Sequence, residues 1–285
     1  MKNVPTLSLL YSSVLISFSG AFRIAIAYLF IGAEISPLNI IAGFLIIYST
    51  YTFDRIIGGE EDKINRNELA QARNDIAMVV CLFSFVAGAF MLFLEDLLII
   101  SFIPITIGVL YSKGVNIGDL KIRLKGGLGM KNFTVALTWG AFITGIVMQD
   151  SSNLLITASV FSFIFVKTFI NTTINDFRDI NGDKAAGLMT LPICLGEKGT
   201  KILLMLIHVI EHVFIIIIMI TGILEFELVI IMSCLISGMI YIPFIRSQTK
   251  KEPDYQKFMH KIFYKFEFYL ALGSRTLLQN FYAII

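Results

Sequence analysis

Residues 154–183 read LLITASVFSFIFVKTFINTTINDFRDINGD, an apolar run that passes directly into a polar segment rich in carboxylates. The apolar part, over 153–174, has the roughly 20 residues that an α-helix needs to cross the hydrocarbon core of a bilayer. The polar part places Asp side chains where this helix would leave the membrane. The stretch therefore predicts a transmembrane helix with carboxylates at one membrane surface.

The whole chain has the composition of a membrane protein. Of its 285 residues, 56% are hydrophobic and 15% are charged, and the mean hydropathy is +0.79, whereas about a quarter of the residues of a soluble protein are charged. A net charge of +2 argues against a nucleic-acid partner. The three cysteines, Cys81, Cys194 and Cys234, form no CxxC metal motif and no disulfide framework. We expect one integral membrane domain over residues 1–285.

Hydropathy predicts an all-α, polytopic bundle of nine transmembrane helices. The fourth segment is short, and the pair Glu95-Asp96 before it indicates a tight helical hairpin. The nine predicted segments are 7–31, 35–57, 76–94, 97–112, 131–148, 153–174, 200–222, 226–245 and 262–284.

The charges of the loops predict the orientation. The loops near 55–75, 113–131, 178–201 and 246–261 hold 18 of the 23 Lys and Arg residues, and the loops between them hold none. Cytoplasmic loops carry the excess of Lys and Arg in membrane proteins. We therefore expect a cytoplasmic N-terminus, and a polar site that faces the cytoplasm.

The segment 175–183 contains a row of possible metal ligands. Asn175, Asp179 and Asp183 are four residues apart, so on a helix they share one face. Oxygen ligands at a membrane surface suit Mg²⁺, which binds a few carboxylates and completes its octahedron with water and phosphate oxygens. A solvated helix end with a repeating polar pattern gives the same spacing, so spacing alone leaves both interpretations open.

A second carboxylate group closes the second predicted helix, where residues 50–62 read TYTFDRIIGGEED. Asp54 and Asp62 are eight residues apart, with Gly58 between them, and the pair Gly58-Gly59 is expected to end the helix. Both carboxylate groups end an apolar helix on the predicted cytoplasmic side. Facing each other, they would bind Mg²⁺ and a diphosphate, with the metal stabilising negative charge on a departing oxygen.

The stretch 175–196, NDFRDINGDKAAGLMTLPICLG, resembles the second signature of the UbiA-type intramembrane prenyltransferases. The resemblance implies a nine-helix bundle that ionises an isoprenoid diphosphate with Mg²⁺ and transfers the prenyl group to an aromatic or lipid acceptor. Asp54, Asp179 and Asp183 would then be catalytic, and Asn175 and Asp62 would complete the metal ligands. The implied ligands of the diphosphate are Arg66, Lys131, Lys184 and Arg178.

The first signature departs from the family form NxxxDxxxD. Thr50 replaces the Asn and Gly58 replaces the second Asp, so only Asp54 matches, and Glu61 or Asp62 is left to supply the missing ligand. This departure keeps a second hypothesis open, a membrane terpene cyclase of the same superfamily, in which double bonds of the substrate trap the carbocation. A transporter of anionic lipids or small molecules is a more distant alternative, disfavoured because the carboxylates gather on one side of the membrane.

Residues 208–212 read HVIEH, the HxxEH pattern of inverted zinc peptidases. His208 and His212 could bind Zn²⁺ with Glu211 as base, but only if a third ligand lay nearby. We favour a hydrogen-bonded polar cluster that faces the interior of the bundle.

Four further charges fall inside predicted helices, namely Arg23, Lys167, Glu267 and Arg275. Charged side chains within a membrane usually face a cavity or a partner rather than lipid. Glu267 lies two helical turns from Arg275, so we expect these two to pair.

Overall fold

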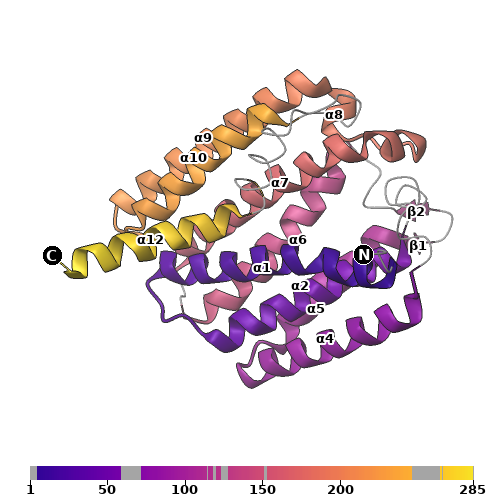
Figure 1. Cartoon of the computed structure of the whole chain (residues 1–285), viewed down its shortest axis with the longest axis horizontal. Helices are drawn as coiled ribbons and strands as arrows, with labels where there is room; N and C mark the ends of the chain where they lie inside the picture. The colour runs from indigo at the N-terminus through magenta and orange to yellow at the C-terminus, as the bar shows by residue number, and fades with distance from the viewer. Residues whose placement is uncertain are drawn as a thin grey trace.

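The computed structural model describes residues 5–58, 72–113, 115–117, 120–122, 128–150, 153–245, 264 and 266–284. In this part of the chain, long helices lie beside one another and run roughly along the longest dimension of the molecule (Figure 1). They are α1 (Pro5–Ile31), α2 (Pro37–Ile57), α4 (Asn74–Leu94), α5 (Leu98–Lys113), α6 (Met130–Val147), α7 (Leu154–Ala185), α9 (Gly196–Ile220), α10 (Leu228–Phe244) and α12 (Glu267–Ile284).

These helices occupy the segments that hydropathy predicted. Five of them, α1, α2, α4, α7 and α9, are long and apolar enough to cross a membrane, and α5 and α10 contain shorter apolar helices. The largest difference from the prediction is in α7, which continues about three turns past the apolar run and ends only at Ala185. That all nine helices cross the bilayer, with the N-terminus in the cytoplasm, stays a prediction.

Local sequence signals explain where helix α2 begins and ends. Ser36 caps α2, because its side chain accepts a hydrogen bond from the backbone N–H of Asn39 and Pro37 follows at the first helical position. The same helix ends at Gly58, which has φ +38° and donates its N–H to the carbonyl of Asp54. This left-handed backbone favours glycine, as expected for the helix break predicted here.

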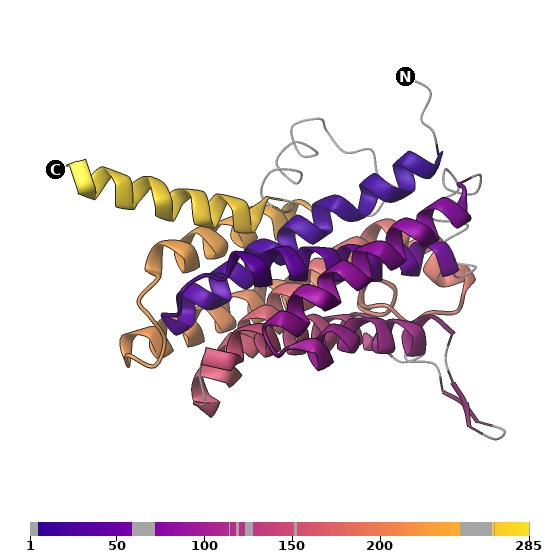
Figure 2. The same ribbon diagram turned by 90° about the horizontal axis from the view of Figure 1, so that it is seen from below.

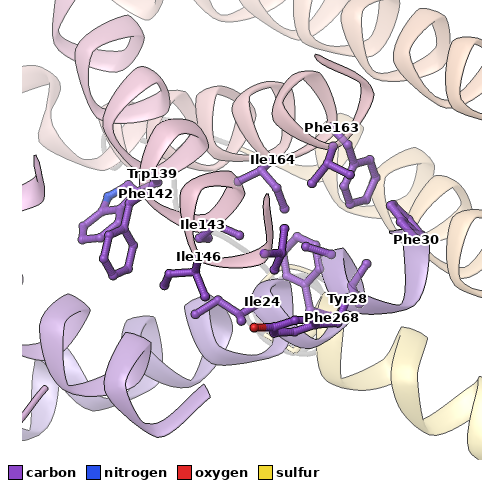
Figure 3. Close-up of a cluster of buried hydrophobic side chains, with 14 of the residues drawn as sticks. Ile24, Tyr28, Phe30, Trp139, Phe142, Ile143, Ile146, Phe163, Ile164 and Phe268 are labelled. Carbon is purple, nitrogen blue, oxygen red and sulfur yellow. The ribbon is translucent and has the colours of Figure 1, made fainter. Parts of the chain in front are cut away.

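The core of the bundle is a cluster of buried apolar side chains contributed mostly by α1 and α6, with further members from α2, α7, α9 and α10. Figure 3 shows its centre, where Ile24, Ile143 and Ile146 are grouped, with Phe30 against Phe163 at one side. In contrast, α4 exposes many large apolar side chains, among them Phe83 and Phe90. A soluble protein rarely exposes so much apolar surface, and in a bilayer this face contacts lipid.

One short β-hairpin is the exception to the all-α prediction within the described residues. Strands β1 (Val115–Ile117) and β2 (Leu120–Ile122) pair antiparallel, with Val115 opposite Ile122. The hairpin lies at the same end of the molecule as the N-terminal end of α1 and as α8 (Leu191–Cys194), and it projects from the bundle in Figure 2. This end carries the polar site.

The buried charges pair differently from the sequence prediction. Lys167 of α7 forms its ion pair with Glu267 of α12, and both side chains are fully buried. Arg275 instead binds Glu227, with 2.7 Å between Arg275 Nε and Glu227 Oε2. The predicted pair of Arg275 and Glu267 is therefore wrong, because each side chain meets a residue of a neighbouring helix rather than one on its own helix.

Candidate functional site

A cavity of about 400 Å³ opens among α1, α2, α6 and α7, and we refer to it as the main cavity. Both acidic and basic side chains line it. The acidic residues all come from the end of α7, whereas the basic residues come from four helices. They are Asp176, Asp179 and Asp183, and Arg23, Arg55, Lys131 and Arg178.

Lys131, in the first turn of α6, joins two of these carboxylates. Its Nζ lies 3.0 Å from Asp176 Oδ1 and 3.0 Å from Asp183 Oδ2. Both Asp side chains are buried, with exposed fractions of 1% and 0%, and the lysine side chain is 19% exposed. Two desolvated carboxylates repel each other unless a cation lies between them, and here the ammonium group is that cation.

Asn132, the next residue of α6, fixes one of the two carboxylates. Its Nδ2 donates hydrogen bonds to Asp176 Oδ2, at 2.6 Å, and to Thr173 Oγ1, at 3.0 Å. Asp176 is therefore held by two successive residues of α6 and has little freedom to turn away from the main cavity. The contact also docks the first turn of α6 against α7.

Asp176 is an acidic site residue that the sequence prediction omitted. Asn175, Asp179 and Asp183 were selected by their four-residue spacing, but Asp176 and Asp183 are seven residues apart, which is two turns of a helix and nearly the same face. Asn175 also lines the main cavity, yet it is exposed and accepts a hydrogen bond of 3.0 Å from the hydroxyl of Tyr264. The spacing of seven was visible in the sequence and would have identified Asp176.

Asp54 does not line the main cavity. It lines a second, smaller hollow of about 60 Å³ between α2, α5 and α6, together with Thr50, the residue in place of the family Asn. Tyr51, Val135 and Trp139 line both spaces and therefore form the wall between them. The rings of Tyr51 and Trp139 stack at 5.5 Å between centroids, and Trp139 Nε1 donates a hydrogen bond of 3.1 Å to the hydroxyl of Tyr51.

Only some of the predicted basic ligands line the main cavity. Lys131 and Arg178 line the main cavity, whereas Lys184 is exposed near the end of α7 and does not line it. Arg66, like the acidic residue Asp62, lies outside the described residues. Their predicted roles stay untested predictions.

Arg55 is a basic residue of the main cavity that the sequence prediction also omitted. Its Nη1 donates a hydrogen bond to Ser13 Oγ, and its Nη2 donates one of 3.3 Å to the carbonyl of Ser12. Arg55 directly follows the signature residue Asp54, so its place in the sequence offered a signal. Its side chain, however, points to α1, which only the packing of α1 on α2 could reveal.

The donor set of the main cavity fits a divalent cation of the Mg²⁺ type. Asp176 and Asp183 converge on one cationic group, and carboxylate oxygens are the ligands such an ion prefers. Within the described ranges, however, no three His, Cys, Asp or Glu side chains come close enough together to hold a metal ion. The protein would therefore supply only part of a coordination sphere, which Mg²⁺ commonly completes with water and phosphate.

The HxxEH segment forms a buried cluster in the middle of α9. His208 and His212 are fully buried, with ring centroids 4.1 Å apart. His208 Nε2 donates to the carbonyl of Leu235, and Glu211 accepts a hydrogen bond of 3.0 Å from Ser162 Oγ. Since no third metal ligand accompanies them in the part of the chain that the structure describes, the zinc-peptidase hypothesis gains no support.

The fold and the site together define an integral, polytopic α-helical membrane protein with a cavity lined by carboxylates and basic side chains. A sequence model of the UbiA prenyltransferase family matches residues 14–266, so the chain belongs to this family. The family resemblance stated from residues 175–196 is confirmed.

Similar proteins agree with this assignment. A digeranylgeranylglyceryl phosphate synthase of Sulfolobus acidocaldarius is 30% identical over 173 residues, which are 59% of this chain and 59% of that protein. Two structures of a UbiA homologue from Archaeoglobus fulgidus share the fold. The form bound to geranyl diphosphate (GPP) and Mg²⁺ has a TM-score of 0.62 at 15% identity and covers 95% of this chain and 99% of that chain. The form bound to dimethylallyl diphosphate (DMAPP) and Mg²⁺ has a TM-score of 0.59 at 16% identity, over 93% and 98%.

Proposed function

We propose that the chain is a Mg²⁺-dependent intramembrane prenyltransferase that ionises an isoprenoid diphosphate and transfers the prenyl group to an aromatic or lipid acceptor. The observation that carries the proposal is the convergence of Asp176 and Asp183 on Lys131 at the polar end of the main cavity. Carboxylates beside basic side chains suit a metal–diphosphate pair, and the apolar walls behind them suit a hydrocarbon chain. Family membership and the ligands of the Archaeoglobus homologue support the same assignment.

The charged residues at the polar end of the main cavity each have a place in the proposed reaction. Asp176, Asp179 and Asp183 would hold Mg²⁺, which when bound stabilises the charge that develops on the departing diphosphate. Lys131, Arg55 and Arg178 would contact diphosphate oxygens, because the main cavity presents these cations around the carboxylates. The stacked rings of Tyr51 and Trp139 would face the allylic carbocation, which an aromatic face attracts.

Asp54 would act from the second hollow, across the wall formed by Tyr51 and Trp139. Its predicted role as a metal ligand on the opposite side of the diphosphate requires this wall to move when substrate binds. The arrangement favours a site in which α7 supplies most of the ligands. We also propose that the polar end of the bundle faces the cytoplasm, because the Lys and Arg residues concentrate in the loops at that end.

The test is the reaction itself. Purified protein in lipid nanodiscs is incubated with Mg²⁺, isoprenoid diphosphates and separate aromatic and glycerolipid acceptors, and the products are identified by mass. We expect released diphosphate and a prenylated acceptor, both abolished by a chelator. A hydrocarbon product formed equally well without acceptor would contradict the transfer and support the cyclase hypothesis.

Matched variants locate the site. Asp176→Asn and Asp183→Asn should each lower the rate by at least about a hundredfold, since each removes charge from the metal position. Asp75→Asn is the control, because Asp75 pairs with Arg73 on the surface and its side chain is 64% exposed. If Asp176→Asn keeps the wild-type rate while remaining Mg²⁺-dependent, the metal lies elsewhere.

A further inference from the structure

The guanidinium of Arg55 lies on the wall of the main cavity and is held there by the neighbouring helix α1. Arg55 belongs to the last turn of α2. It donates hydrogen bonds from Nη1 to the hydroxyl of Ser13 and from Nη2, at 3.3 Å, to the carbonyl of Ser12. Neither acceptor carries a charge, so these two bonds orient the guanidinium without neutralising it. An arginine oriented in this way still attracts an anion in the cavity.

Ser13 is built into the interface between α1 and α2. Its side chain is fully buried and does not itself line the main cavity. The hydroxyl accepts a second hydrogen bond, of 2.9 Å, from Oγ1 of Thr52, about one turn before Arg55 on α2. A hydroxyl oxygen has two acceptor lone pairs, and these two donors take both of them. Any influence of Ser13 on the main cavity therefore passes through Arg55.

Two glycines bring α1 and α2 close together, and Figure 1 shows these helices side by side. A Cβ at Gly20 of α1 would lie 2.1 Å from Cδ1 of Ile47. A Cβ at Gly43 of α2 would lie 2.1 Å from Cδ1 of Ile24. Each isoleucine thus fills the space above a glycine of the facing helix. Gly20 follows Ser13 by seven residues, two turns along nearly the same face of α1. This close packing fixes Ser13 opposite the last turn of α2.

An arginine side chain at the end of a helix needs such an anchor to bind an anion well. The side chain has about 2 kcal/mol of rotamer entropy, and a ligand that must order it binds more weakly. Arg55 is only half-buried, and α2 ends just beyond it, at Gly58. The hydrogen bonds to α1 order the guanidinium when the protein folds, before any ligand arrives.

We propose that Ser13 is a positioning residue of the diphosphate site, because its hydroxyl holds the Arg55 guanidinium where diphosphate oxygens bind. Ser13 itself touches neither the metal nor the diphosphate. The first signature lacks a carboxylate at Gly58 and would contact the diphosphate through this cation, while α7 supplies the metal ligands. The inference rests on the proposed function, because it takes the anion in the main cavity to be a diphosphate.

The experiment measures two affinities by calorimetric titration of the protein in nanodiscs. One is the affinity for Mg²⁺ alone, and the other is the affinity for inorganic diphosphate in excess Mg²⁺. The proteins are the wild type, Ser13→Ala, Arg55→Gln and the double variant. Ser17→Ala is the matched control, because Ser17 is equally buried one turn further along α1 and its hydroxyl donates to the carbonyl of Ser13.

We expect Ser13→Ala to weaken diphosphate binding by about three- to tenfold, the effect of one lost hydrogen bond. Arg55→Gln should weaken it by at least about tenfold, because a charged contact is lost. Neither change should alter the affinity for Mg²⁺ alone, and Ser17→Ala should match the wild type in both titrations. Ser13→Cys keeps the size of the side chain but offers only a weak acceptor. It should act in the same direction and decides the question if Ser13→Ala does not fold.

The double variant separates positioning from a general loss of structure. In the Arg55→Gln background, Ser13→Ala should weaken diphosphate binding by less than about twofold, because the group that it positions is gone. A merely structural serine would weaken binding by the same factor in both backgrounds.

Two results would overturn the inference. The first is a folded Ser13→Ala protein that binds diphosphate as tightly as the wild type. The second is an equal loss of affinity in both backgrounds, or a loss of affinity for Mg²⁺ alone. The proposed function fails in a different way, since no protein of the series, the wild type included, then binds diphosphate in a Mg²⁺-dependent manner. In that case the inference fails with it.

Discussion

The ammonium group of Lys131 has two partners in the proposed reaction, the carboxylates of α7 and the diphosphate, and it cannot serve both fully at once. Its ammonium neutralises Asp176 and Asp183 in the protein without ligands, at 3.0 Å from an oxygen of each. A bound Mg²⁺ would take over these carboxylates, and the lysine would then be available to a phosphate oxygen. The residue thus keeps the carboxylates in place before the metal and substrate arrive.

This competition predicts the behaviour of Lys131→Met. The variant should lose at least about a hundredfold in turnover, because a diphosphate contact is gone. Without Mg²⁺ it should also be less stable, by about 3–5 kcal/mol, since two buried carboxylates lose their cation. Added Mg²⁺ should raise the melting temperature of the variant more than that of the wild type. Thermal unfolding in detergent over a Mg²⁺ series measures this.

Lys198→Met provides the control for this substitution. Lys198 is exposed near the start of α9 and does not line the main cavity. Its replacement should change neither turnover nor the response to Mg²⁺. If Mg²⁺ stabilises Lys131→Met no more than the wild type, these carboxylates do not form the metal position.

At the scale of the elements, α9 and α10 pack closely where Gly238 of α10 faces His208 of α9. A Cβ at Gly238 would lie 2.1 Å from Nε2 of His208 on α9 and would displace the imidazole from its hydrogen bond to Leu235. The buried histidine pair therefore acts as a packing and hydrogen-bonding element between the two helices. This role explains why a zinc-like motif occurs in a helix that binds no metal in the proposed function.

Gly238→Ala should destabilise the protein by about 1–3 kcal/mol, the usual cost of an overpacked core. His208→Ala in the same chain should remove the clash, so the double variant should be more stable than the sum of the single changes predicts. Gly273→Ala is the control, because nothing lies within 4 Å of its added Cβ. The melting temperatures of the wild type, the two single variants and the double variant form a double-mutant cycle. If the two single shifts simply add up in the double variant, Gly238 and His208 are not in contact.

The buried ion pair between Lys167 and Glu267 joins α12 to α7 inside the bundle. Glu267→Leu should lower stability by about 3–5 kcal/mol, because it leaves a buried ammonium without its carboxylate. Lys167→Met in addition should restore most of this loss, since two apolar side chains of similar size replace the ion pair. Glu197→Gln removes the partly exposed pair with Lys201 and should cost no more than about 0.5 kcal/mol. If Glu267→Leu and the double variant melt at the same temperature, the loss in Glu267→Leu does not come from the unpaired lysine.

At the scale of the whole molecule, apolar and charged side chains are found in different places. Apolar side chains cover the outside of the bundle, as on α4, whereas the charged lining of the main cavity gathers toward one end. Such a protein can sit in a bilayer in two orientations that bury the same apolar surface. The Lys and Arg residues of the loops decide between them.

The orientation is testable by cysteine labelling. In a protein whose three native cysteines are replaced, Glu34→Cys should react with a membrane-impermeant maleimide in intact cells, because it lies exposed in a loop predicted outside. Lys198→Cys, exposed in a loop predicted inside, should react only after the membrane is opened. The reverse pattern would place the carboxylates outside the cytoplasm.

The sequence by itself determined the membrane architecture and the family. Apolar runs of about 20 residues form helices in a bilayer because no other structure satisfies their backbone groups. For that reason the segments read from hydropathy coincide with the observed helices. The signature from Asn175 to Gly196 was likewise readable, because its residues are close together on one chain segment.

Only the tertiary structure decided which side chains meet. Arg275 binds Glu227 instead of Glu267, and Asp54 lies behind Tyr51 and Trp139 instead of beside Asp183. Spacing along one helix gives the face that a residue occupies, but not the neighbour that this face meets. That neighbour depends on how the helices pack, which is set by many weak contacts spread over the whole bundle. The hydrogen bond from Arg55 to Ser13 of the neighbouring helix is a product of that packing alone.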